Sequence, residues 1–194
     1  MSITNYLCAF ATGIALAAVS GAIAQNPAPP ERGEVVDTAA PQPASGDTEA
    51  LSTLVVVNRH EITAAELAQS KEIDAATRDY AKMLENDHRA NLEKVDTLSK
   101  LARAPITESP EVAQLKSKAA DERASLGRLD GKEFQNAYLD AMVQGHAEVL
   151  SKIDDKLLPG SSDAAVQQHL RSTRESVSRH LAKAKELRGG SPAH

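Results

Sequence analysis

Three of the six histidines lie at helical spacing from apolar residues, and the imidazole side chain can both bind a metal and exchange protons. The apolar neighbours are three or four residues away: Leu84 and Leu92 for His88, Met142 and Val149 for His146, and Val177 and Ala184 for His180. Residues three and four apart share one face of a helix. We therefore expect three different helices each to point one imidazole toward a common interior.

Carboxylates near these histidines extend the candidate site. Glu85 and His88 form an E-x-x-H pattern, and Glu61 lies at the inner edge of an earlier helix. Imidazole with carboxylate suits zinc, copper, nickel or iron. The sequence thus predicts a single transition-metal ion held by His88, His146 and His180 with Glu61 or Glu85. Asp87 is expected to orient one of the rings.

Two other interpretations of the histidines stay open. Interior imidazoles can be satisfied core residues bonded to helical partners, and Glu85 can pair outward with Arg89 instead of reaching a metal. Clustered histidines can also sense pH between 5 and 8. Either alternative describes a non-catalytic envelope stress or interaction protein. No glycine-rich phosphate loop and no G-x-S-x-G occurs, so enzymatic activity stays undecided.

Helical periodicity recurs from Glu49 onward, and no strand pattern interrupts it. The predicted helices cover 49–71, 74–103, 109–127, 130–157 and 162–188. Their predicted starts are Asp74, Ser109 before Pro110, Asp130 with Glu133 as a capping box, and Ser162. The short connections favour an all-α fold, an antiparallel four-helix bundle with one additional short helix.

The N-terminal segment is predicted to direct export. Residues 1–24 contain no charged side chain, and an apolar run from Tyr6 to Val19 precedes the sequence Ala22-Ile23-Ala24. This pattern is typical of a signal peptide cleaved after Ala24, with an uncleaved membrane tether as the alternative. Residues 25–48 hold five of the nine prolines and are predicted to form a disordered linker. The folded domain is expected over 49–188, followed by a flexible tail at 189–194, in the periplasm.

Composition excludes several classes of function. The 22 basic and 27 acidic residues give a net charge of −5 without a basic cluster, which argues against a nucleic-acid partner. Acidic and basic residues are mixed along the helices, so no membrane contact beyond the export signal is expected. The single cysteine, Cys8, excludes a multi-cysteine metal site. A protein partner and the oligomeric state are not predicted.

The order of motifs resembles the exported bacterial family called domain of unknown function 4142, which is placed among ferritin-like bundles. The matching stretches are HEITAAELAQ (60–69), YAKMLENDH (80–88), FQNAYLDAMVQGH (134–146) and RESVSRHLAKAKEL (174–187). The resemblance implies a ferritin-like helical bundle in the cell envelope, with no established activity. Ferritin-like di-iron enzymes carry two E-x-x-H helices, whereas Val143 and Val177 precede His146 and His180 by three here. A mononuclear, histidine-rich site is therefore expected.

Overall fold

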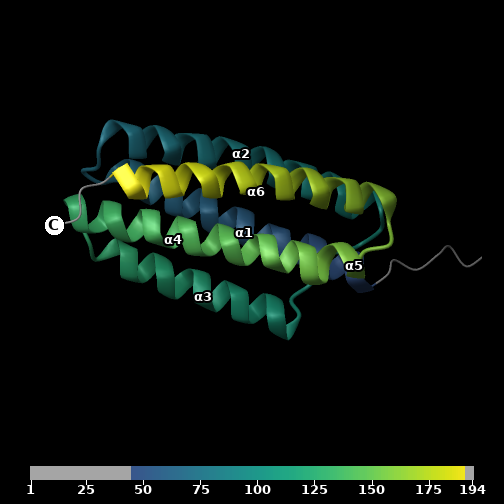
Figure 1. Cartoon of the computed structure of the whole chain (residues 1–194). Coiled ribbons are helices and arrows are strands. Elements are labelled where there is room, and N and C mark those ends of the chain that lie inside the picture. The colour runs from purple at the N-terminus through teal and green to yellow at the C-terminus, as the bar shows by residue number, and fades with distance from the viewer. Residues whose placement is uncertain (1–44, 191–194) are drawn as a thin grey trace, which may run out of the picture. The chain divides into compact units, whose positions relative to one another are not determined.

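The computed structural model describes residues 45–190, and within them every regular element is helical (Figure 1). The long elements are α1 (Ser45–Ser70), α2 (Ala75–Leu101), α3 (Pro110–Gly127), α4 (Gly131–Lys152) and α6 (Ala164–Gly190). A π-helical turn, η1 (Ile153–Leu157), and a short turn, α5 (Leu158–Gly160), join α4 to α6. The predicted signal peptide and most of the predicted linker lie outside the described residues, as do residues 191–194.

Helices α1, α2, α4 and α6 form the predicted antiparallel four-helix bundle. Helix α1 lies along α2, α4 lies along α6, and α2 also contacts α6 (Figure 1). Helix α3, the shortest of the five, lies outside the bundle against α1 and α4. The predicted all-α fold, an antiparallel four-helix bundle with one additional shorter helix, is therefore confirmed within residues 45–190.

Two apolar core segments fill the bundle, one toward each end. One contains Ala64, Ala68, Leu84, Phe134, Tyr138, Met142 and Ala184 among others. The other contains Leu51, Leu54, Val95, Leu98, Ile153, Val166 and Leu170 among others. Each segment combines the start of two helices with the end of the other two, as antiparallel neighbours require.

A layer of buried polar side chains separates the two apolar segments. It consists of Asn58 and Glu61 on α1, His88 on α2, His146 on α4, and Thr173 and His180 on α6. Buried polar groups destabilise a fold unless they are hydrogen-bonded or paired. This layer is consequently the part of the interior whose chemistry needs an explanation.

Two of the predicted helix starts are confirmed. Asp74 caps α2 by accepting a hydrogen bond from the Thr77 amide at 2.7 Å. Ser109 caps α3 by accepting one from the Val112 amide at 3.2 Å, with Pro110 in the first turn. Both residues satisfy amides that a helix leaves without a partner in its first turn.

Asp130 lies at the predicted start of α4 but without the predicted capping box, and the predicted start of α6 at Ser162 is wrong by one residue. Asp130 makes no capping bond to α4, because its carboxylate instead accepts from Lys71 Nζ at 2.7 Å. Helix α6 is capped by Asp163 rather than Ser162, with the Asp163 carboxylate accepting from the Val166 amide at 3.0 Å. In each case a neighbouring charged group offers the stronger partner.

Helix α1 begins at Ser45, four residues before the predicted start at 49 and inside the range predicted as linker. Asp47 is buried there and accepts hydrogen bonds from the Ser162 and Asp163 amides. Gly46 permits this contact, since a Cβ at that position would lie 1.8 Å from the carbonyl oxygen of Gly160. The start of α1 is thus fixed by contacts more than 100 residues away in sequence.

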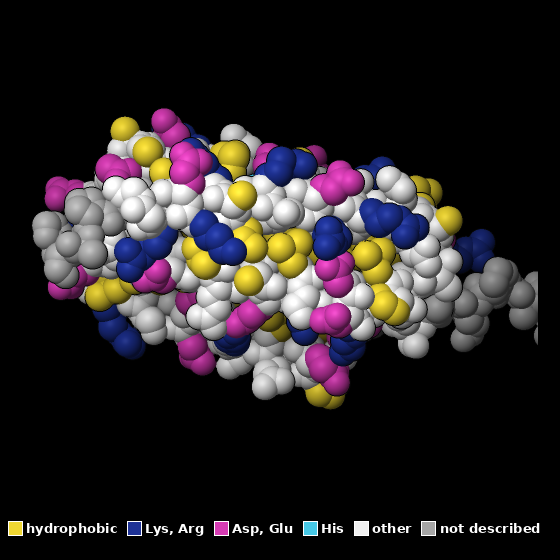
Figure 2. Space-filling model, in the orientation of Figure 1, with side chains coloured by type: hydrophobic (Ala, Val, Ile, Leu, Met, Phe, Trp, Pro, Cys, Tyr) yellow, Lys and Arg dark blue, Asp and Glu magenta, His cyan; other side chains and the backbone are white. Residues whose placement is uncertain are grey.

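The surface carries both signs of charge. On the face shown in Figure 2, basic and acidic side chains are interspersed, in line with the mixed charges along the sequence. Among the described helices, none combines the length and the apolar character needed to cross a membrane.

Candidate metal centre

The three predicted histidines converge in the buried polar layer. His88 is 3% exposed, His146 is 1% exposed and His180 is 2% exposed. One ring nitrogen from each lies within 4.8 Å of the others, and the ring centroids are 5.3 to 6.2 Å apart. Three separate helices therefore bring three imidazoles to one point, as the helical spacing indicates.

Each imidazole is oriented by a hydrogen bond from one of its two nitrogens. His88 Nδ1 donates to Asn58 Oδ1 at 2.9 Å, and His146 Nδ1 donates to the Met142 carbonyl at 2.7 Å. His180 Nε2 donates to the Asp87 carboxylate at 2.8 Å. Because all three acceptors are oxygens that cannot donate, the proton of each neutral ring lies on the bonded nitrogen.

The remaining nitrogen of each ring carries a free lone pair. Among residues 45–190, His88 Nε2, His146 Nε2 and His180 Nδ1 are buried without a hydrogen-bond partner. Leaving one buried polar atom unpaired costs about 1–3 kcal/mol. Three such atoms in one small space form a set of ligands that a single cation can satisfy together.

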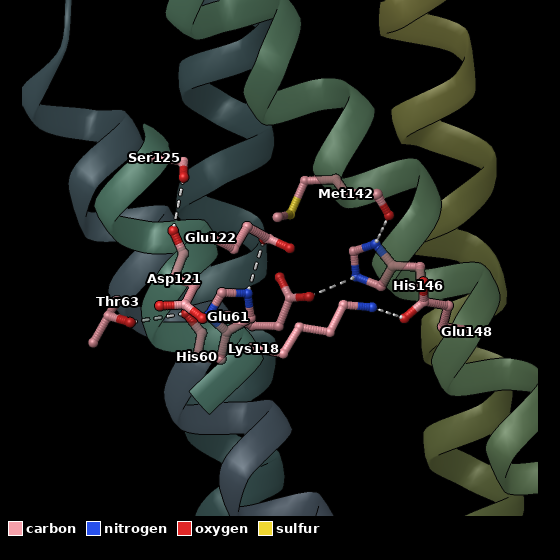
Figure 3. A network of polar contacts seen from close by, with 10 residues as sticks. All are labelled: His60, Glu61, Thr63, Lys118, Asp121, Glu122, Ser125, Met142, His146 and Glu148. Atoms are coloured by element: carbon pink, nitrogen blue, oxygen red, sulfur yellow. Dashed lines mark hydrogen bonds and ion pairs between the residues drawn. The ribbon is translucent and has the colours of Figure 1, made fainter. Parts of the chain in front are cut away.

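Glu61 adds a carboxylate from α1, the fourth helix of the bundle. Its side chain is buried, and its Oε1 lies 3.9 Å from His146 Nε2 (Figure 3). Its Oε2 has no hydrogen-bond partner in the described part of the chain. The predicted inner position of Glu61 therefore places an anionic oxygen beside the imidazoles.

A chain of hydrogen-bonded side chains fixes the orientation of the His88 ring through Asn58. Asn58 Nδ2 donates to Asn91 Oδ1 at 2.8 Å, and Asn91 Nδ2 donates to Thr173 Oγ1 at 2.8 Å. This chain joins α1, α2 and α6 at the level of the histidines. Asn58 and Asn91 were not predicted to act at the site. The available signal was Asn58, a polar residue one helical turn before Glu61 and next to a buried apolar run.

Glu85 is not part of the group of buried ligands. Its carboxylate accepts from Gln69 Nε2 at 2.7 Å and from Arg89 Nε at 2.9 Å. These two hydrogen bonds lower the pKa of Glu85. The pairing with Arg89 four residues later turns Glu85 outward, so the E-x-x-H pattern supplies only its histidine to the cluster.

The protonation states at the site suit metal ligation. Burial lowers the pKa of His88 to about 4, and burial also lowers the pKa of His180 despite its hydrogen bond to Asp87. Burial by itself would raise the pKa of Glu61, but the surrounding imidazoles, led by His146 and His88, lower it. At neutral pH His88 and His180 therefore offer neutral imidazole nitrogens beside the Glu61 carboxylate.

The donor set is three nitrogens and one carboxylate oxygen. Zinc–nitrogen bonds are about 2.0–2.1 Å long, which places ligands of a tetrahedral ion ~3.3 Å apart. The imidazole nitrogens lie within 4.8 Å of one another, so the rings would move inward by at most about an ångström to bind such an ion.

Comparisons with known proteins agree with the fold. A family model described as "Domain of unknown function (DUF4142)" matches residues 34–187. The crystal structure of a DUF305 fragment from Deinococcus radiodurans is similar, with a TM-score of 0.67, 14% identity, and coverage of 77% of this chain and 99% of that chain. The crystal structure of a putative secreted DUF305 protein from Streptomyces coelicolor gives a TM-score of 0.63, 16% identity, and coverage of 78% and 99%. No curated protein matches the sequence. At these identities the two crystal structures support the fold alone.

Proposed function

The chain belongs to the family of domain of unknown function 4142, and we propose that it binds one transition-metal ion through His88, His146, His180 and Glu61. One observation carries the proposal. Each ring donates its proton to a fixed acceptor, so the three remaining lone pairs share one buried space. Hydrogen bonds of this kind from the distal nitrogen are typical of histidines that ligate metals.

A purely structural polar cluster accounts less well for these contacts. Buried polar atoms in native proteins are nearly always hydrogen-bonded. A cluster that only specified packing would pair its rings with donors, whereas three imidazole nitrogens and Glu61 Oε2 are without partners among residues 45–190. Neutral lone pairs beside an ionised carboxylate attract a cation.

The ligand types favour zinc, copper, nickel or iron over magnesium or calcium, which prefer oxygen ligands. Among the described residues, Glu61 is the one buried carboxylate next to the rings, because Asp87 is about half exposed and already accepts from His180. A second metal ion bridged by carboxylates would need further acidic ligands there. We therefore propose a mononuclear centre.

We further propose that the protein acts outside the cytoplasm, after export by the predicted signal at residues 1–24. The similar protein from Streptomyces coelicolor is described as a putative secreted protein. N-terminal sequencing of protein recovered from the periplasm tests cleavage after Ala24. Recovery of the intact N-terminus in the membrane fraction would favour the uncleaved tether.

Metal content provides the direct test of the proposed function. We expect the wild-type protein to bind about one Zn²⁺ or Cu²⁺ per chain, measured by elemental analysis after dialysis and by titration calorimetry. Loss of one ligand in His146→Ala should weaken binding by at least about 100-fold. The matched control is His169→Ala, which removes a histidine outside the cluster and should bind as the wild type does.

The result that contradicts metal binding is equally clear. If His146→Ala and the wild type retain the same amount of metal, the ion is held elsewhere or not at all. The three histidines would then be left as a structural feature of the core.

A further inference from the structure

A cavity of about 70 Å³ lies between α1, α3 and α4, on the side of the bundle where Glu61 is located. A cavity needs about 10–15 Å³ to hold one water molecule, so this one holds a few. Glu61 lines the cavity, and its carboxylate also points toward His146 (Figure 3). One carboxylate therefore belongs both to the cavity and to the buried centre.

Gly145 keeps the path beside Glu61 open. It lines the cavity on α4, one residue before His146, and the nearest heavy atom to a Cβ built there is Glu61 Oε1, at 3.9 Å. An alanine would fit that position in ordinary contact, whereas a longer side chain would extend into the cavity. The absence of a side chain at 145 thus leaves space next to the carboxylate.

Two ion pairs between the helices close the mouth of the cavity, and one of them is exposed. Glu148 on α4 pairs with Lys118 on α3, and Glu122 on α3 pairs with His60 on α1 (Figure 3). Lys118 and Glu148 are both about half exposed, and ion pairs in such positions contribute about 0–1 kcal/mol. In α3 only Val112 and Leu126, near its two ends, are buried. Separating Lys118 from Glu148 therefore costs little free energy.

A second groove reaches the centre from the opposite side, between α2 and α6. It is lined by Asp87, Lys94, His169, Arg179 and two of the candidate ligands, His88 and His180. Here the single carboxylate, Asp87, already accepts from His180, and two cationic side chains, Lys94 and Arg179, also line the groove. The cavity beside α3 instead has three carboxylates, Glu61, Glu122 and Glu148, against two lysines. Electrostatic focusing of a cation favours the cavity beside α3.

From these observations we propose that the cavity between α1, α3 and α4 is the passage by which the metal ion enters and leaves the centre, with Glu61 as the ligand that receives it from solvent. This inference rests on the proposed metal binding. The ion passes the carboxylates at the mouth, exchanges water for Glu61 oxygen, and then reaches the three imidazoles. No bond other than metal–ligand bonds forms or breaks.

Metal exchange kinetics of the full chain test the passage. Zn²⁺ association is measured by stopped flow, Zn²⁺ release by transfer to an excess of a chromophoric chelator, and affinity by equilibrium titration. We expect Gly145→Leu to slow association and release by about tenfold each, because a filled passage raises a barrier common to both directions. The affinity should stay within about threefold, since no ligand is changed. Gly145→Ala is the matched control and should exchange Zn²⁺ at the wild-type rates.

A second pair of variants keeps the test decisive if Gly145→Leu does not fold. Glu148→Lys reverses the charge at the mouth and should slow association at low salt, with the effect fading as salt rises. Ser176→Leu obstructs the groove between α2 and α6 and should leave both rates unchanged. Wild-type rates in Gly145→Leu and Glu148→Lys, or slow exchange in Ser176→Leu, would overturn the passage while leaving metal binding intact. A wild-type protein that binds no Zn²⁺ would overturn the proposed function itself.

Discussion

The imidazoles of the polar layer show how far single residues can be understood from spacing alone. Positions 88, 146 and 180 follow the apolar periodicity of their helices, so their inward direction is predictable. Glu61 is predictable for the same reason. The outward direction of Glu85 was not predictable from spacing. A rotation of the helix by a fraction of a turn decides whether this carboxylate contacts Arg89 or points toward the histidines.

Asp87 and Asn58 illustrate a second limit at this scale. Asp87 was expected to orient an imidazole, and it does so for His180 on α6, 93 positions later in the chain. Asn58 orients His88 across the α1–α2 interface. Contacts between helices depend on which helices are neighbours, and one sequence without the fold does not give that information.

Burial of His88 makes the stability of the metal-free protein depend on pH. The pKa of His88 is about 4 in the folded protein against 6.5 for the free side chain. As the pH falls below 6.5, the unfolded chain takes up a proton that the folded protein excludes, so the folded state loses stability. Full stability is present above pH 6.5, and the loss by pH 4.5 should be about 2–3 kcal/mol from this residue.

Urea unfolding at pH 7 and pH 4.5, in the presence of a chelator, measures this loss. His88→Leu removes the titrating group and should show a smaller fall in the free energy of unfolding between the two pH values. Equal falls in the variant and the wild type would mean that His88 is protonated without penalty.

Helices were easier to predict than their ends. The run Leu54–Val57 is rich in β-branched residues, yet it lies inside α1 because Leu54, Val55 and Val57 are buried against the core. Tertiary packing outweighs the small intrinsic cost of such residues in a helix. The capping box at Asp130 and the start of α6 at Ser162 were predicted incorrectly, because Lys71 and Asp163, each a charged neighbour, determine the local hydrogen bonds.

Asp47 connects the start of the first helix, α1, to the residues just before the last helix, α6. Its buried carboxylate accepts from the amides of Ser162 and Asp163 and from the Ser162 hydroxyl. Asp47→Ala leaves these donors without a partner and should lower the free energy of unfolding by about 2–3 kcal/mol. Urea unfolding of the variant measures the change.

Asp130→Ala is the comparison for this prediction. The Asp130 side chain is 80% exposed and pairs with Lys71, so its removal should cost less than about 1 kcal/mol. Similar losses in the two variants would show that the contact between α1 and the start of α6 contributes no more than a surface ion pair.

Across the whole molecule, the polar layer divides one apolar interior into two. The two segments are each well packed, but the layer between them holds several polar atoms without partners in residues 45–190. A ligand that binds only the folded state stabilises it by mass action, by about 2.7 kcal/mol at a free concentration 100 times Kd. An ion at this level would therefore join the two halves of the interior.

Thermal unfolding measures that stabilisation. For a domain of this size, ~2.7 kcal/mol should raise Tm by about 5–10 °C when saturating Zn²⁺ replaces a chelator. His146→Ala should show little change in Tm on adding the metal, and His169→Ala should respond as the wild type does. An equal rise in His146→Ala would indicate that the metal stabilises the fold from another place.

The candidate ligands come from all four helices of the bundle, and the last of them, His180, lies only ten residues before the end of α6. A chain shortened by proteolysis or premature termination before that point lacks a complete set of donors, however well its earlier helices associate. If the proposed ion is bound, its capture would therefore distinguish chains that include His180 from shorter fragments.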